Sequence, residues 1–126
     1  MVIGYVPKPE GEAALVAGVE EARVRGARLV VVHALLDHGA EPAYLGEVRG
    51  ALEEAGVEHE LRLVERGSEA ADDLVGVAEE ESADLIVIGL RRRSPVGKLI
   101  LGSNAQRVLL DAPCPVLTVK PRTGRH

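Results

Sequence analysis

Two uninterrupted apolar runs constrain the fold of this chain more than any other feature. Residues 29–32 read LVVV and residues 85–88 read LIVI, and a polar residue or a glycine follows each run. A strand that other elements cover on both faces is apolar at every position, whereas a half-exposed strand alternates. The runs therefore predict central strands of a parallel sheet with helices on both faces.

Strands and helices are expected to alternate along the rest of the chain. Apolar or alternating segments predict strands at residues 2–5, 29–33, 58–65, 85–88 and 116–120, and helical spacing predicts helices at 10–25, around 45–52, after Ser68, and from Ser103 to about 110. This pattern predicts an α/β fold with three layers, α/β/α, around a parallel sheet of five strands. The order 2-1-3-4-5 and the order 3-2-1-4-5 both fit, and ligands bind where the winding reverses.

Composition limits the kind of protein this is. The 126 residues suffice for one domain, which we assign to residues 1–121, and we expect residues 122–126 to fray. The net charge is −5 and no basic stripe extends over the chain, which argues against nucleic-acid binding. No apolar stretch approaches the ~20 residues of a membrane span. A single cysteine excludes an internal disulfide and, with no signal-peptide pattern, favours a cytoplasmic location.

One segment departs from the acidic character of the chain. Residues 85–110 contain no acidic residue, and four cations lie between the strand and the next helix: Arg91, Arg92, Arg93 and Lys98. Gly102 and Ser103 begin that helix, whose first amides have no partner within it and can bind an anion. We therefore expect a basic loop beside the helix start, with phosphate as the anion.

The same segment resembles the universal stress proteins. Their nucleotide-binding members carry G-x2-G-x9-G-[ST] after the fourth strand, and this chain has Gly89-x2-Arg92-x9-Gly102-Ser103. The resemblance covers the whole chain, including the last strand, PCPVLTVKP. It implies a 3-2-1-4-5 sheet, a homodimer formed through the edge strand from Val116 to Lys120, and ATP bound at the switch point in one branch of the family. An open apolar edge strand also favours closure into a dimer.

Transferred residue by residue, the resemblance implies a set of binding residues. Gly89, Gly102, Ser103 and Asn104 would cradle phosphate, Arg91 and Arg92 would neutralise it, and Val6 and Ala34 would line the adenosine end. Two of these positions differ from the nucleotide-binding relatives, which have a glycine at Arg92 and an aspartate at Val6. Each residue also has a plainer explanation: Gly89 would let the chain turn out of the sheet, Ser103 would cap a helix, and the arginines would form a solvated loop.

Two functions of different classes follow. The first is a dimeric regulatory module that binds ATP or another adenine nucleotide, with or without magnesium. The second is a dimeric interaction protein that binds no nucleotide, and whose basic loop binds an acidic partner or another anion.

Enzymatic functions find little support in the motifs. The chain has no G-x4-G-K-[ST] and no G-x-S-x-G, and no pair of acids follows its first strand. We expect no dedicated catalysis, with slow ATP hydrolysis as the upper limit. The histidines lack metal-ligand spacing, so we expect no metal site. His33, at the end of a strand, is expected to be packed or hydrogen-bonded rather than catalytic.

Overall fold

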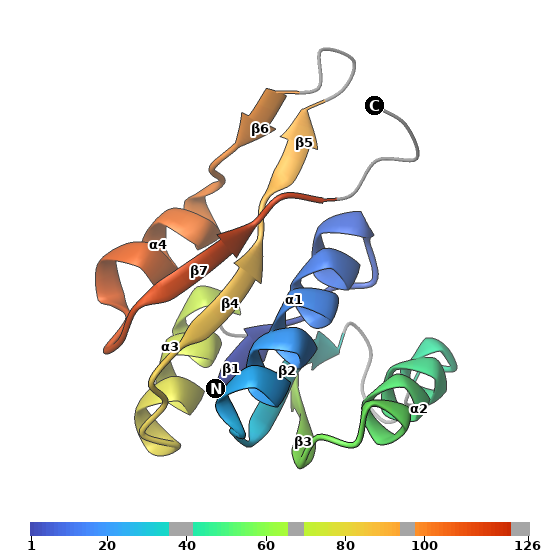
Figure 1. Ribbon diagram of the computed structural model, residues 1–126. Helices are drawn as coiled ribbons and strands as arrows, with labels where there is room; N and C mark the ends of the chain where they lie inside the picture. Colours follow the sequence, from blue (N-terminus) through green and yellow to red (C-terminus); the bar gives the residue numbers. More distant parts are fainter. Residues whose placement is uncertain (36–41, 66–69, 94–97, 122–126) are drawn as a thin grey trace.

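A computed structural model describes residues 1–35, 42–65, 70–93 and 98–121 of the chain (Figure 1). Its strands are β1 (Val2–Gly4), β2 (Leu29–Leu35), β3 (His59–Glu65), β4 (Ile86–Gly89), β5 (Arg91–Arg93), β6 (Lys98–Ile100) and β7 (Val116–Val119). Its helices are α1 (Pro9–Arg25), α2 (Tyr44–Ala55), α3 (Ala70–Glu80) and α4 (Ser103–Asp111). Every predicted strand and helix is present, within a few residues of its predicted bounds. The predicted cap Ser68 and the tail 122–126 lie outside the described residues.

Five strands form one parallel sheet in the order β3-β2-β1-β4-β7. Numbered along the chain, this is the 3-2-1-4-5 order. The chain winds outward from β1 to β3 in one direction and from β4 to β7 in the other. The reversal therefore falls between β1 and β4, and their C-terminal ends mark the place where ligands bind in such sheets.

The sheet is covered on both faces by apolar side chains. One buried cluster joins the strands to α1 and α2 and includes Ile3, Val31, Val87, Leu15, Leu45 and Leu52. The other joins them to α3 and α4 and includes Val2, Val30, Ile86, Leu74, Val77 and Val108. Neighbouring residues of a strand thus enter opposite layers, which explains why residues 29–32 and 85–88 are apolar at every position. The predicted three-layer α/β/α architecture is confirmed.

Helix α1 begins and ends at residues suited to those positions. Pro9 is in its first turn, and its first-turn acids and last-turn arginines match the helix dipole. Gly26 ends it in the left-handed conformation, with φ of 62°. Within the helix, a Cβ on Gly18 would lie 2.1 Å from Cδ1 of Ile3. The absence of a side chain at Gly18 therefore lets α1 lie close against β1.

The basic segment is a hairpin, and the prediction of a loop there was wrong. β5 and β6 pair antiparallel, with Arg91 opposite Ile100 and Arg93 opposite Lys98. In Figure 1 the hairpin extends beyond the C-terminal ends of β4 and β7, away from the body of the domain. A run of three arginines has no alternation of apolar and polar residues, so its pairing gave no strand signal.

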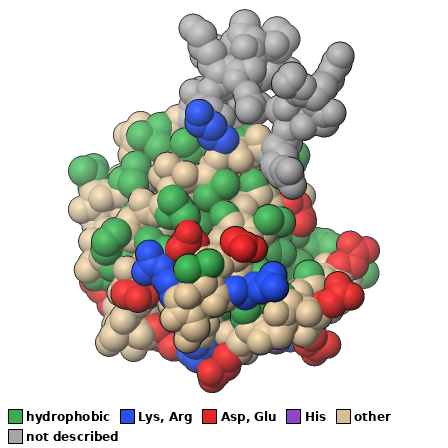
Figure 2. Space-filling view, in the orientation of Figure 1, with side chains coloured by type: hydrophobic (Ala, Val, Ile, Leu, Met, Phe, Trp, Pro, Cys, Tyr) green, Lys and Arg blue, Asp and Glu red, His purple; other side chains and the backbone are tan. Residues whose placement is uncertain are grey.

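The edge of the sheet formed by β3 carries a network of ion pairs. Arg28 lies 2.6 Å from a carboxylate oxygen of Glu60, and Arg62 lies 2.7 Å from one of Glu81. Figure 2 shows acidic and basic side chains interspersed over the lower part of the molecule. Ion pairs near the surface add little stability each, but these leave both arginines neutralised. No helix of the described ranges is long and apolar enough to cross a membrane.

Candidate functional site

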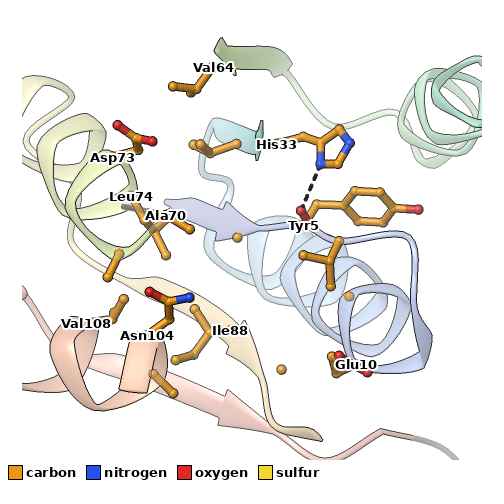
Figure 3. Close-up of a pocket in the computed structure, with 17 residues that line it drawn as sticks. Tyr5, Glu10, His33, Val64, Ala70, Asp73, Leu74, Ile88, Asn104 and Val108 are labelled. Atoms are coloured by element: carbon orange, nitrogen blue, oxygen red, sulfur yellow. Dashed lines mark hydrogen bonds between the residues drawn. The ribbon is translucent and has the colours of Figure 1, made fainter. Parts of the chain in front are cut away.

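A cavity of about 210 Å³ lies at the C-terminal ends of β1, β2 and β4, where the winding reverses. The strand ends contribute Gly4, Val32 and Ile88, while α3 and α4 contribute small or apolar side chains: Ala70, Ala71, Leu74, Ala105 and Val108 (Figure 3). Apolar walls of this kind take an apolar or aromatic group out of water.

Polar side chains are few around the cavity. Glu10 from α1, Asp73 from α3 and Asn104 from α4 line it, together with His33 from β2. Among the described lining residues there is no lysine or arginine. An anionic part of a ligand would therefore be bound outside the apolar cavity, by backbone amides or by cations of neighbouring elements.

Two glycines allow the first turn of α1 to close one side of the cavity. A Cβ on Gly11 would lie 1.8 Å from the carbonyl oxygen of Val6, and a Cβ on Gly89 would lie 1.9 Å from that of Glu10. Contacts this short do not occur, so any other residue at either position requires the backbone to move. Gly89 thus has a packing role between β4 and α1, which neither prediction for it included.

Three of the predicted binding residues line the cavity, namely Val6, Gly89 and Asn104. Val6 follows β1 with a side chain that is 40% exposed, and Asn104 is exposed in the first turn of α4. Ala34 belongs to β2 and Arg92 to β5, but their side chains are outside what the structure describes.

The other predicted residues gather at the start of α4, beside the cavity. Gly102, not Ser103, is the N-cap, and Ser103 is the first helical residue. A Cβ on Gly102 would lie 3.2 Å from Nη2 of Arg91, so the guanidinium of Arg91 is next to the helix start. Arg91 is exposed and makes no hydrogen bond or ion pair with any described residue. The first amides of a helix, which have no partner within it, and a guanidinium unpaired among the described residues together suit an anion.

The universal stress protein family model matches residues 1–120. The chain belongs to the universal stress protein family. A universal stress protein of Mycolicibacterium smegmatis is 41% identical over 127 residues, which cover 96% of this chain and 97% of that protein. A solved universal stress protein of Archaeoglobus fulgidus in complex with dAMP has a TM-score of 0.69 and 32% identity, covering 94% of this chain and 96% of its own. A solved universal stress protein in complex with cAMP has a TM-score of 0.73 and 30% identity, covering 96% and 95%.

This universal stress protein also has polar residues at the site whose role was not predicted. Glu10 and Asp73 lie in the first turns of α1 and α3, where acids match the helix dipole, and that explanation concealed their place at the cavity. Their only further signal was position, because both helices begin at the edge where the strands end. Within the described ranges, no group of three or more His, Cys, Asp or Glu could hold a metal ion.

His33 of this universal stress protein is buried and hydrogen-bonded, as predicted. It is 4% exposed, with Nδ1 3.1 Å from the Tyr5 carbonyl oxygen and Nε2 2.6 Å from the Tyr44 hydroxyl. Burial lowers the pKa of His33, so its ring is neutral near pH 7. The hydroxyl of Tyr5 donates to Glu12 at 2.6 Å, and burial together with that carboxylate raises the pKa of Tyr5.

Proposed function

We propose that this universal stress protein binds an adenine nucleotide in the cavity and acts as a dimeric regulatory module. The observation that carries the proposal is the position of the cavity, at the reversal between β1 and β4 and beside the start of α4. The apolar walls would take the adenosine portion, and the helix start would take the phosphate. The relatives solved with dAMP and with cAMP support this choice of ligand.

In the proposed complex the binding residues divide between two ends. Val6 and Ala34 would line the adenosine end, and Gly89 would keep the wall formed by α1 in place. Phosphate would lie at the opposite end, bound by the amides of Gly102, Ser103 and Asn104 and neutralised by Arg91 and Arg92. ATP would be held by the same groups, with magnesium accompanying its phosphates.

We further propose a homodimer formed through β7, over Val116 to Lys120. β7 is one edge of the five-stranded sheet, and three leucines are exposed on β7 and α4: Leu117, Leu109 and Leu110. Leu110 is 84% exposed, and a group of exposed apolar side chains, rather than a single one, is the feature that favours an interaction surface. An antiparallel pair of β7 strands would cover both the open edge and these side chains.

The proposed role is binding rather than catalysis, and we place it in the cytoplasm. The polar side chains that the described chain brings to the cavity are a histidine with both ring nitrogens already bonded, a tyrosine whose hydroxyl is bonded to Glu12, two carboxylates and an amide. A carboxylate acting on water would support slow ATP hydrolysis at most.

Thermal unfolding of nucleotide-free protein tests the proposed ligand. The protein is heated with AMP, cAMP, ADP, ATP or inorganic phosphate at millimolar concentration, with and without magnesium. A ligand at a hundredfold its Kd adds about 2.7 kcal/mol of stability, which raises the unfolding temperature by several degrees. We expect a rise with one or more adenine nucleotides and none with phosphate alone. An unchanged unfolding temperature with every nucleotide would rule out this function.

A second function is favoured by the distribution of charge. The described residues of the cavity include two carboxylates and no cation, whereas Arg91 lies on a projecting hairpin without an ionic partner among the described residues. Val6 and Arg92 also stand where nucleotide-binding relatives have an aspartate and a glycine. The alternative is a dimeric interaction protein whose basic hairpin binds an acidic partner or another anion. Gly102→Leu separates the two, because it would block phosphate at the helix start but would remove none of the basic side chains that an acidic protein would contact on the hairpin.

A further inference from the structure

A buried histidine joins three elements at the edge of the cavity. His33 lies at the C-terminal end of β2 and lines the cavity. Its ring contacts the backbone of Tyr5, after β1, and the hydroxyl of Tyr44, the first residue of α2. Both tyrosine rings meet the imidazole edge to face, with ring centres 5.6 Å apart. One side chain thus connects β2, the turn after β1 and the start of α2.

The hydrogen bonds of His33 fix its tautomer. A carbonyl oxygen only accepts, so Nδ1 carries the proton that is donated to Tyr5. Nε2 of the neutral ring then accepts from the hydroxyl of Tyr44. The nearby carboxylate of Glu12 accepts from the hydroxyl of Tyr5 instead of contacting the imidazole. The two ends of the imidazole therefore have separate partners, which separate substitutions can remove.

The turn at residues 5–8 forms the wall of the cavity that follows β1. The amide of Tyr5 donates to Val32 at 2.9 Å, and the amide of Lys8 donates back to Val6 at 2.8 Å. The carbonyl of Tyr5 is buried with its residue, and the His33 ring is the partner that the structure shows for it. Removing that donor would leave a buried carbonyl without this bond, and rotation of the turn toward water would then relieve the loss. Such a rotation would carry Val6 out of the cavity wall.

We propose that His33 is a positioning residue, which holds the turn at residues 5–8 in the conformation that forms the cavity and ties that turn to α2 through Tyr44. Its consequence for ligand affinity rests on the proposed nucleotide function. Its consequence for the turn does not, and it can be measured without any ligand.

Three variants separate the two bonds. His33→Asn keeps an amide nitrogen close to the place of Nδ1 and so retains a donor for Tyr5. His33→Phe keeps a ring of similar size and removes both bonds. Tyr44→Phe removes only the bond to α2. If His33→Phe fails to fold, His33→Gln replaces it, because its longer side chain reaches toward Tyr44 rather than Tyr5.

Hydrogen exchange without ligand is the first measurement. The amide of Lys8 reports the turn, and the amide of Val30, which donates to Met1 in the sheet, serves as the reference. In His33→Phe we expect exchange at Lys8 to accelerate at least about tenfold more than at Val30, whereas His33→Asn stays within about threefold of wild type. Equal acceleration at both amides would show that the ring acts through packing alone and would overturn the proposal. Asparagine behaving like phenylalanine would overturn it as well.

Binding of AMP by calorimetry is the second measurement. We expect affinity to fall at least about tenfold in His33→Phe and to remain within about threefold in His33→Asn. Equal affinities in wild type and His33→Phe would contradict a positioning role at this site. If wild type itself binds no AMP, the proposed function fails, while the exchange experiment still decides whether His33 holds the turn.

Discussion

Gly89 is a position near the cavity where one added methyl group should be costly. In Gly89→Ala the new Cβ would lie 1.9 Å from the carbonyl oxygen of Glu10 and 2.6 Å from its carbonyl carbon. These atoms are backbone and cannot rotate aside, so β4 or the first turn of α1 must shift by about 1 Å. Overpacking of this kind costs about 1–3 kcal/mol. The shift would also displace the cavity wall that α1 forms, so binding of AMP should weaken together with stability.

The same substitution at Gly76 is the control. Gly76 lies inside α3, and a Cβ there would meet no atom within 4 Å. Gly76→Ala should therefore add about 0.5–1 kcal/mol, the difference between glycine and alanine in a helix. Thermal unfolding converts these values at about 4 °C per kcal/mol for a domain of this size. An unfolding temperature for Gly89→Ala equal to or above that of Gly76→Ala would refute the close contact between β4 and α1.

Three further predictions concern the phosphate end, the dimer and pH. Gly102→Leu would displace the guanidinium of Arg91 and so lose a charge-assisted bond of about 1.5–3 kcal/mol. Calorimetry should then show that AMP affinity falls about tenfold or more, with little change in unfolding temperature. Unchanged affinity would show that phosphate does not bind at the start of α4. The amides of Ile86 and Leu90 donate to the carbonyls of residues 115 and 119, so Thr118 directs its own amide away from β4. Light scattering should therefore show a monomer for Thr118→Pro, which lacks that amide hydrogen, and a dimer for Thr118→Val. A dimeric proline variant would exclude pairing through β7. The pKa of His33 is lower in the folded state than its ordinary 6.5, so between the folded and the unfolded pKa the unfolded state binds more protons. The free energy of unfolding in urea should therefore fall as the pH decreases below about 6.5, and His33→Phe should lose this pH-dependent part of the stability. A pH dependence that is the same in His33→Phe would mean that the ring is not desolvated.

The sheet could be predicted because burial on both faces leaves a direct record in the sequence. Leu85 to Ile88 has no polar residue, and the two faces of β4 enter separate apolar clusters. β3 at the edge alternates, with Leu61 and Leu63 directed to one cluster, as its pattern predicted. The β5–β6 hairpin left no such record, because neither face of a short projecting ribbon has to be apolar. The sequence of residues 94–97, which lie outside the described residues, contains a proline and a glycine, and these residue types are typical of turns.

The location of the cavity could be predicted, but not its construction. The reversal of winding and the start of α4 follow from the order of elements, and they predicted the edge of the sheet at which the cavity lies. The contact of Gly89 with Glu10 could not be predicted, because it depends on how closely a distant helix approaches the strand. The link between His33 and Tyr44 was equally hidden, since it depends on where α2 begins relative to the sheet. Sequence patterns indicate which residues are buried, whereas contacts of this kind depend on the distances between elements.

In the proposed complex the cavity and the hairpin recognise different parts of the ligand. The described lining of the cavity includes no lysine or arginine, so it supplies no cationic side chain to a phosphate. Phosphate is then favoured only toward Gly102 and Arg91, where the helix start and the guanidinium are positive. The apolar cavity would therefore select a nucleoside, and the hairpin would set how strongly each added phosphate contributes. Because Arg91 is exposed, that second contribution would weaken with salt, whereas burial of the nucleoside would not.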